Sequence, residues 1–188
     1  MPKKKISKKA KIKKQTKIIQ TKVTKLLDQA KIKYKTLEHK VVFTAHDVGA
    51  TTKRKLSEIA KVVLVKVDGW EPSSVKSSIK KKDSVNFVLI VLPAGKYVDF
   101  SGIKKALKAK KVSMASEKDI AKYLKTKVGL LHPFGSEYNL QTLLDKGMSR
   151  SKKMIASAGT FTDSVEVGLK DFQKMVKPIL GNFSKAKK

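Results

Sequence analysis

Two long apolar segments, residues 59–67 and 86–92, constrain the fold more than any other part of the chain. Both are rich in Val, Leu and Ile, and β-branched residues of this kind favour strands. The residues between them begin with Asp68-Gly69-Trp70-Glu71-Pro72 and continue into a lysine run, which is typical of turns and loops. The simplest arrangement is therefore a long β-hairpin, in which the two apolar strands pair across a basic loop.

One charged residue, Lys61, interrupts the first of these strands. Strand alternation places it on the same face as Ile59, Val63 and Val65. If that face points inward, the ammonium group lies at the wall of a cavity, where it can bind a phosphate or a carbonyl group. Alternatively, the side chain extends to the edge of the sheet and reaches solvent. The sequence leaves both interpretations open.

The rest of the chain mixes helical and strand patterns without regular βαβ alternation, which indicates an α+β fold. Helices are expected at residues 17–30, 44–50, 100–107, 116–124 and 171–176. Further strands are expected at residues 32–38, 112–114, 141–144, 154–158 and 165–169. We assign residues 17–180 to one folded domain. Residues 1–16 form a basic tail that is expected to be disordered, either a solubilising segment or an RNA-binding arm, and residues 181–188 form a second basic tail.

The charge of the chain restricts its partners. The formal net charge is +29, and every basic residue except Arg54 and Arg150 is lysine. A codon bias toward A-rich triplets would also raise the glutamate content, but only six glutamates are present, so selection for positive charge is the better explanation. Lysines act as point charges on phosphates rather than as bidentate readers of bases. This composition favours RNA bound by its shape over sequence-specific DNA recognition.

Several classes of protein are disfavoured by what the sequence lacks. The absence of cysteine excludes disulfides, thiolate zinc sites and a cysteine nucleophile. The three histidines do not have metal-ligand spacing, and no common nucleotide-binding or hydrolase motif is present, so we expect neither a metal nor a cofactor. No run of 18 apolar residues or secretory signal is found. We expect a cytoplasmic protein without a membrane partner.

Two short turns could approach a ligand. Gly129-Leu130-Leu131-His132-Pro133-Phe134-Gly135 has glycine at both ends and proline between them, as in a rigid turn whose N–H groups face a ligand oxygen. In that case His132 can act as a general base, but an ordinary turn between a helix and a strand has the same composition. Ser157-Ala158-Gly159-Thr160 can likewise line the same pocket or form a tight hairpin.

Taken in order along the chain, these segments form a recognisable series. The motifs are Glu38-His39, Thr44-Ala45-His46-Asp47-Val48, residues 59–69, Val91-Leu92-Pro93-Ala94, Val98-Asp99-Phe100, Ala115-Ser116-Glu117, residues 128–135, Leu144-Asp145 and Ala158-Gly159-Thr160. The series resembles the YbaK/prolyl-tRNA synthetase-associated domain family over about residues 26–176. Each motif is weak by itself, whereas the complete series is specific. The resemblance implies a mixed, mostly antiparallel, barrel-like sheet with surrounding helices.

Members of this family are typically aminoacyl-tRNA deacylases that act as free-standing enzymes or as inserts in synthetases. The resemblance implies that this chain hydrolyses the ester bond of mischarged tRNA in trans, with Lys61 as the catalytic residue. It implies substrate binding by the loop from Gly129 to Gly135, by Gly159 and Thr160, and by His46. The implied partners are mischarged tRNA and an aminoacyl-tRNA synthetase. The alternatives are a non-catalytic tRNA- or RNA-binding protein that retains the fold, and a DNA-binding protein.

The chain departs from the family pattern at two places. Many relatives carry histidine two positions after the glycine that corresponds to Gly159, whereas this chain has Phe161. This substitution leaves the amino-acid specificity open. In addition, the loop from Trp70 to Val85 looks longer and more basic than the usual hairpin. We expect that loop to contact RNA through Lys80, Lys81 and Lys82.

Overall fold

The expected hairpin is the centre of the fold. In the computed structural model, which describes residues 20–70 and 85–186, β2 (Ala60–Asp68) and β3 (Val85–Pro93) pair antiparallel over their full length. Their register joins Ala60 to Pro93 at one end and Asp68 to Val85 at the other. The loop with Lys80, Lys81 and Lys82 lies outside the described residues.

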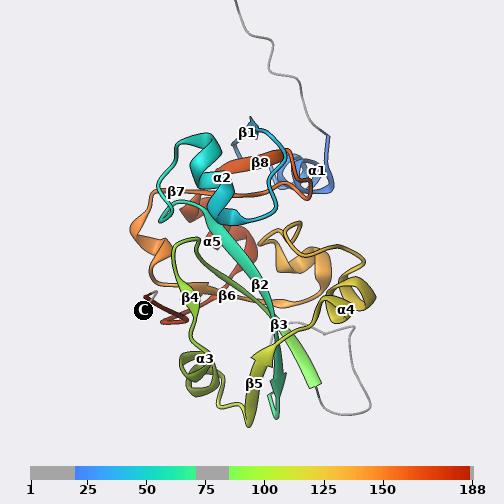
Figure 1. The fold of residues 1–188 in the computed structure, drawn as a ribbon, viewed down its shortest axis with the longest axis vertical. Coiled ribbons are helices and arrows are strands. Elements are labelled where there is room, and N and C mark those ends of the chain that lie inside the picture. Colours follow the sequence, from blue (N-terminus) through green and yellow to red (C-terminus); the bar gives the residue numbers. More distant parts are fainter. Residues whose placement is uncertain (1–19, 71–84, 187–188) are drawn as a thin grey trace, which may run out of the picture.

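Three further strands extend the hairpin into a five-stranded sheet with the order β5-β2-β3-β6-β9 (Figure 1). β5 (Lys111–Met114) pairs antiparallel with β2. β6 (Gln141–Asp145) lies parallel to β3, and β9 (Ile179–Gly181) lies parallel to β6. Both faces of β3 are covered, since Val91 packs in one core cluster and Ile90 in another. Burial on both faces explains why this strand reads as a continuous apolar run.

A second, fully antiparallel sheet contains β1 (Tyr34–Glu38), β8 (Asp163–Gly168) and β7 (Lys153–Ser157), in that order. A parallel bridge between Ile59 and Ile155 joins it to the start of β2. The two sheets therefore meet two residues before Lys61, which places this lysine at their junction.

Helices cover the two sheets, and three of the longer helices begin where the sequence supplies a side-chain cap. Thr21, Thr44 and Asp99 accept hydrogen bonds from backbone N–H groups at the first turns of α1, α2 and α3, which lowers the cost of starting a helix. The helices are α1 (Lys22–Gln29), α2 (Ala45–Thr52), α3 (Phe100–Leu107), α4 (Glu117–Asp119), which continues as the π-helix η1 (Ile120–Leu124), the 3₁₀ turns η2 (Gly135–Tyr138) and η3 (Met148–Arg150), and α5 (Leu169–Val176).

The α+β class predicted from the sequence is confirmed, with strands that pair mostly antiparallel. The sheets do not close into a barrel, so the barrel-like description holds only loosely. The helix expected at residues 116–124 divides into α4 and η1. Sequence patterns did not indicate β4 (Tyr97–Val98), β9 or β10 (Ser184–Lys185), because strands of two or three residues are too short to show alternation.

The C-terminal segment of the described chain, beyond residue 180, packs as part of the domain. The expected domain boundary at residue 180 falls within β9, and β10 pairs with β4. Between them, Phe183 is fully buried, and its N–H donates to Oδ2 of Asp145 at 2.7 Å. None of the helices within residues 20–70 and 85–186 combines the length and apolar character needed to cross a bilayer.

Candidate functional site

A pocket with a volume of about 260 Å³ opens at the junction of the two sheets. Its wall combines the segment that leads into α2, the first residues of β2, the loop at residues 128–131 and the turn between β7 and β8. Of the residues named from the sequence, Lys61, Gly129, Leu131 and Thr160 line it. Other lining residues include His39, Phe43, Val128, Ser157 and Ser164. The pocket is mainly apolar with a few polar groups, as ligand sites usually are.

Lys61 is half-buried at the wall of this pocket. Its Nζ donates a hydrogen bond to the backbone carbonyl of Lys96 and lies 5.3 Å from the centroid of the Tyr97 ring. Burial lowers the pKa of the ammonium group, because desolvation disfavours its charge. Within residues 20–70 and 85–186 no carboxylate forms an ion pair with Lys61. Neutral groups therefore hold this cation, and its charge remains available to an anionic or polarised ligand.

Two constraints, the backbone conformation and a close neighbouring atom, require glycine at position 129. Its φ is +87°, in a region that L-residues with a side chain rarely adopt. A Cβ at this position would lie 2.6 Å from the carbonyl oxygen of Phe43. The glycine thus lets the loop approach the segment before α2 and close one side of the pocket. The N–H of Leu130 donates to the carbonyl of Lys127 at 3.2 Å, so this N–H is used within the turn.

The second half of the same loop belongs to the core. His132 is 6% exposed, and its ring stacks on Tyr138 with centroids 4.5 Å apart. Its Nδ1 is buried and has no hydrogen-bond partner within the described residues. Burial, together with the charge of Lys22, lowers the pKa of His132 to about 4, so the imidazole is neutral near pH 7. Pro133, Phe134 and Gly135 are also buried, and His132 does not line the pocket.

The turn between β7 and β8 contributes hydroxyl groups. Ser157 and Thr160 line the pocket. Gly159 has a φ of +88°, and its N–H donates to Oγ of Ser157 at 3.1 Å. Thr160 donates from Oγ1 to Oδ2 of Asp163 at 2.7 Å, which fixes the shape of the turn. By contrast, His46 is exposed on α2 and is not part of the pocket wall.

A histidine and a serine that were not assigned a role from the sequence form a pair in the pocket. Nε2 of His39 lies 2.9 Å from Oγ of Ser164, and Nδ1 lies 2.9 Å from the carbonyl oxygen of Lys40. A carbonyl only accepts, so a neutral ring carries its proton on Nδ1 and accepts the Ser164 hydroxyl at Nε2. The Glu38-His39 motif could have pointed to the histidine as a site residue. No sequence motif pointed to Ser164, which is 125 positions away from its partner.

Two aromatic rings meet at the opening of the pocket. Phe43 is 64% exposed, although it lines the pocket, and its ring packs against Phe161 with centroids 5.1 Å apart. Val128, on the same wall, is 50% exposed. Phe161 is one of the two departures noted with the family resemblance. The described residues contain no group of three or more His, Asp or Glu side chains placed to hold a metal ion.

Comparison with known proteins agrees with this architecture. The chain is similar to a crystal structure described only as a hypothetical protein, with a TM-score of 0.73 and 16% identity over 87% of this chain and 99% of that one. It is also similar to a structure described as a candidate trans-editing enzyme for prolyl-tRNA synthetase, with a TM-score of 0.68 and 14% identity over 87% and 95% of the two chains. No curated protein sequence matches. The sequence profile of the aminoacyl-tRNA editing domain matches residues 39–175, which include the whole pocket, and the chain therefore belongs to the aminoacyl-tRNA editing domain family.

Proposed function

We propose that the protein is a trans-acting aminoacyl-tRNA deacylase that hydrolyses the ester bond of mischarged tRNA. The observation that carries this proposal is the placement of Lys61 and the Gly129 turn on the wall of one pocket. Such an enzyme would act in the cytoplasm on tRNA released by a synthetase, which would be a transient partner. A pocket of about 260 Å³ is near the lower end of small-ligand sites, which suits an amino-acid side chain.

In the proposed reaction a water molecule attacks the ester carbonyl carbon, and the bond to the ribose oxygen of the terminal adenosine breaks. Negative charge develops on the carbonyl oxygen, where a fixed cation or an N–H donor lowers the barrier most. Lys61 supplies the cation in this scheme. Because the N–H of Leu130 is used within its turn, the N–H groups of Gly129 and Leu131 are the donors that the loop could offer.

The attacking water also needs a group that orients it. The Ser164 hydroxyl donates its hydrogen bond to Nε2 of His39, so its oxygen can accept a hydrogen bond from the water and hold it in place. A free hydroxyl of the terminal ribose can assist in the same way. After attack, the ribose oxygen leaves with one proton of the water, which regenerates the tRNA end, and the other proton is lost to solvent when the new carboxyl group of the amino acid ionises.

The test is deacylation of a panel of mischarged tRNAs that begins with alanyl- and cysteinyl-tRNA for proline. Loss of one oxyanion-stabilising group typically costs about 10²–10³-fold in rate. We therefore expect Lys61→Ala to lower kcat/KM by about 10²-fold or more while the affinity for tRNA changes little. Lys111→Ala, which removes an exposed lysine from β5, is the matched control and should keep the wild-type rate. Full activity of Lys61→Ala would contradict the proposal.

A non-catalytic tRNA-binding protein is the second candidate, and one observation favours it. The Lys61 ammonium is bound to the Lys96 carbonyl and lies near the Tyr97 ring, so substrate must compete for it. Tight tRNA binding by the wild type without hydrolysis of any mischarged substrate would support this candidate over the deacylase.

A further inference from the structure

A second, larger hollow lies beside the pocket. It has a volume of about 690 Å³ and is formed by three loops: the approach to β2, the turn after β3, and the segment from η3 to β7. Its cationic side chains are those of Lys55, Lys96, Arg150, Lys152 and Lys153. We call this hollow the basic groove. Five of its twelve lining residues are Lys or Arg, against 44 of 188 in the chain, so the cations are concentrated here beyond the general excess.

The charges of the groove are largely unneutralised. Lys153 pairs with the buried Glu166 at 2.9 Å, and the same carboxylate also accepts from Arg54 at 2.8 Å. Lys55, Lys96, Arg150 and Lys152 are exposed, and within residues 20–70 and 85–186 none of them forms an ion pair. Among the described residues that line the groove, Glu58 is the one acidic residue. Converging cations without counter-charges attract an extended anion.

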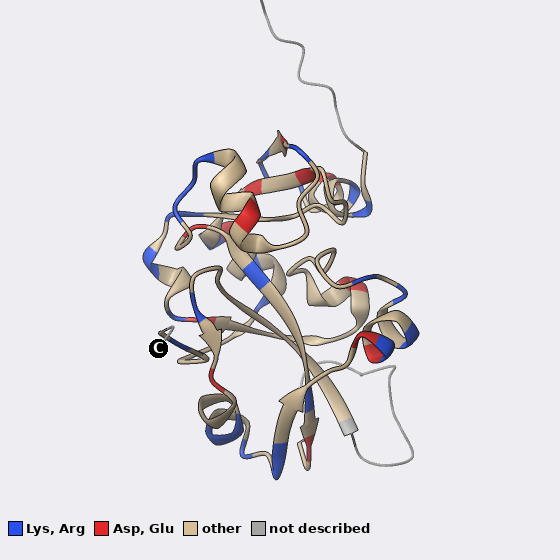
Figure 2. Cartoon of the chain, in the orientation of Figure 1, with Lys and Arg blue, Asp and Glu red and all other residues tan. Residues whose placement is uncertain are grey.

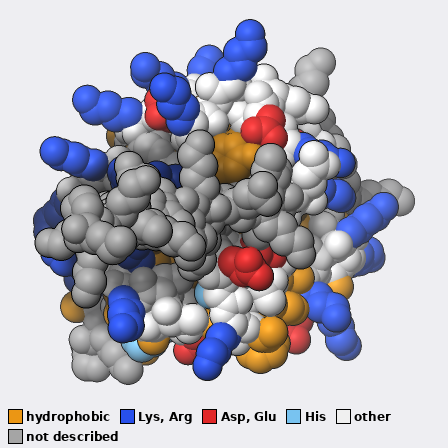
Figure 3. All heavy atoms as spheres, turned by 90° about the horizontal axis from the view of Figure 1, so that it is seen from above, with side chains coloured by type: hydrophobic (Ala, Val, Ile, Leu, Met, Phe, Trp, Pro, Cys, Tyr) orange, Lys and Arg blue, Asp and Glu red, His pale blue; other side chains and the backbone are white. Residues whose placement is uncertain are grey.

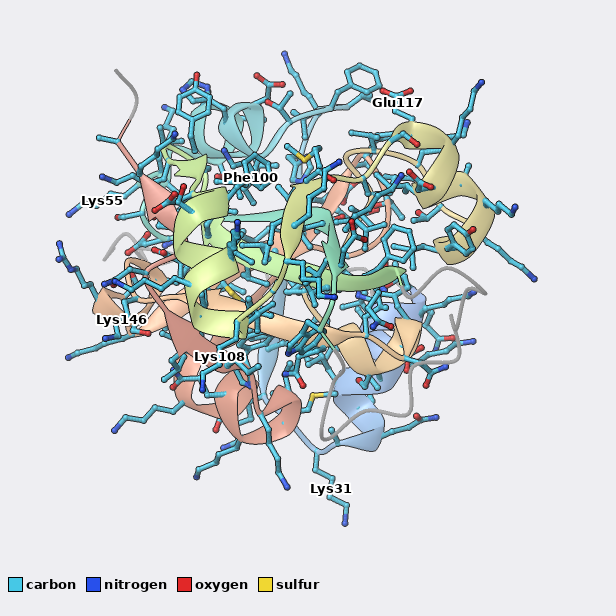
Figure 4. The ribbon with its side chains drawn as sticks, turned by 90° about the horizontal axis from the view of Figure 1, so that it is seen from below. Lys31, Lys55, Phe100, Lys108, Glu117 and Lys146 are labelled. Atoms are coloured by element: carbon cyan, nitrogen blue, oxygen red, sulfur yellow. The ribbon has the colours of Figure 1, made fainter. Side chains whose placement is uncertain are left out.

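The groove adjoins the candidate active site through β2. The Lys61 side chain lines the pocket, yet its ammonium group bonds to the carbonyl of Lys96, a residue that lines the groove. The loops of the groove lie at the left of the molecule in Figure 1, where Figure 2 shows repeated Lys and Arg positions. Seen from below, Lys55 and Lys146 lie at this same edge, whereas Glu117 of α4 lies on the opposite side (Figure 4).

We propose that the basic groove binds the phosphodiester backbone of the tRNA acceptor arm while the aminoacylated 3′ end occupies the pocket, an inference that rests on the proposed function. Lysine-rich walls contact phosphates without reading bases, so the groove supplies affinity and position rather than sequence recognition. It thereby gives a specific place to part of the net charge of +29. Figure 3 shows that Lys and Arg side chains also project around the rim of the face seen from above.

The experiment compares two triple variants that remove the same charge from opposite sides of the molecule. The groove variant carries Lys55→Gln, Arg150→Gln and Lys152→Gln, which spares Lys153 and its ion pair. The control variant carries Lys118→Gln on α4, Lys122→Gln on η1 and Lys125→Gln directly after η1, all at exposed positions. Affinity for uncharged tRNA is measured across a series of salt concentrations. Circular dichroism and urea unfolding establish that both variants fold.

Each phosphate contact contributes about 0.7–0.9 to the slope of log K against log salt. For the groove variant, the magnitude of this slope should therefore fall by about two. Its binding to tRNA should be roughly 50-fold weaker at about 0.15 M salt. The control variant should remain near the wild type. Equal losses of tRNA affinity in the two variants would show that only the overall positive charge of the protein matters, and this would overturn the proposal. Unchanged tRNA binding by the groove variant would also overturn it. Stronger wild-type binding to duplex DNA than to tRNA would overturn tRNA as the occupant.

A parallel kinetic measurement separates this inference from the proposed function. On an aminoacyl-adenosine ester, which lacks the acceptor arm, the groove variant should keep the wild-type kcat/KM. On full-length mischarged tRNA its kcat/KM should fall with the affinity. Absence of hydrolysis by the wild type, together with weakened tRNA binding in the groove variant alone, would refute the deacylase and leave the groove as the tRNA site.

Discussion

The buried imidazole of His132 makes the stability of this protein depend on pH. Its Nδ1 has no hydrogen-bond partner within the described residues, and its ring is packed between Tyr138 and Phe134, with centroids 4.5 and 5.9 Å away. Protonation would place a charge among these rings. The pKa of His132 is accordingly lowered to about 4 from the ordinary value of 6.5.

The direction of the effect follows from proton linkage. Between pH 6.5 and about 4 the unfolded chain binds a proton at this residue and the folded protein does not, so stability falls as the pH falls. Lowering the pKa of His132 from 6.5 to about 4 corresponds to a loss of about 3 kcal/mol once the pH is below both values. At about pH 5 some 2 kcal/mol of this should already be lost relative to about pH 7.5.

The assay is urea unfolding at several values between about pH 7.5 and about pH 5. His132→Phe keeps an aromatic ring against Tyr138 but cannot titrate, so its free energy of unfolding should vary less with pH, by about 2 kcal/mol over this range. Comparing the pH dependence, rather than the absolute stability, removes any packing cost of the larger ring. His46→Gln, at an exposed position, should keep the wild-type profile. Parallel profiles for the wild type and His132→Phe would refute the reasoning.

Two further predictions concern the backbone. Gly129→Ala combines a positive φ with a Cβ 2.6 Å from a backbone oxygen, whereas Gly159→Ala has a similar φ and nothing within 4 Å. Gly159→Ala should lower the free energy of unfolding by about 1–2 kcal/mol because of its φ alone. Gly129→Ala should lower it further and should also impair deacylation. Equal urea midpoints for the two variants would contradict the close approach of Gly129 to the Phe43 carbonyl. Asp145→Ala removes the acceptor of two N–H groups, those of Gly147 and Phe183 at 2.8 and 2.7 Å, and should destabilise by about 3 kcal/mol in denaturant unfolding. A loss below about 1 kcal/mol would show that the C-terminal segment does not depend on this carboxylate.

Much of the fold follows from local patterns in the sequence. The apolar runs that form β2 and β3 identify the hairpin, and Asp99 marks the start of α3, whose bounds match the expectation of residues 100–107. The family resemblance is confirmed by the editing-domain match. These features can be predicted from the sequence because strand burial and helix capping each leave a pattern among residues that are adjacent in the chain.

The candidate site was only partly accessible to the same reasoning. Lys61 stood out because a charge within an apolar strand needs a partner or a role, and Gly129 because a close approach requires glycine. The loop as a whole was assigned to substrate, but the structure places His132 and Phe134 in the core, because the chain turns inward after Leu131. Whether a loop residue faces a pocket or the core depends on what packs beneath it.

Local patterns along the chain were enough to predict the α+β class, the central hairpin, the positive charge, and Lys61 and Gly129 as residues of the pocket wall. Which distant groups share a site depends instead on how the sheets pair and pack. The register that pairs Leu37 with Ser164 brings His39 to a serine 125 positions away, and three separate loops converge to form the basic groove. Sequence patterns report the environment of neighbouring residues, whereas contacts between distant segments are fixed by strand register and by the packing of the two sheets.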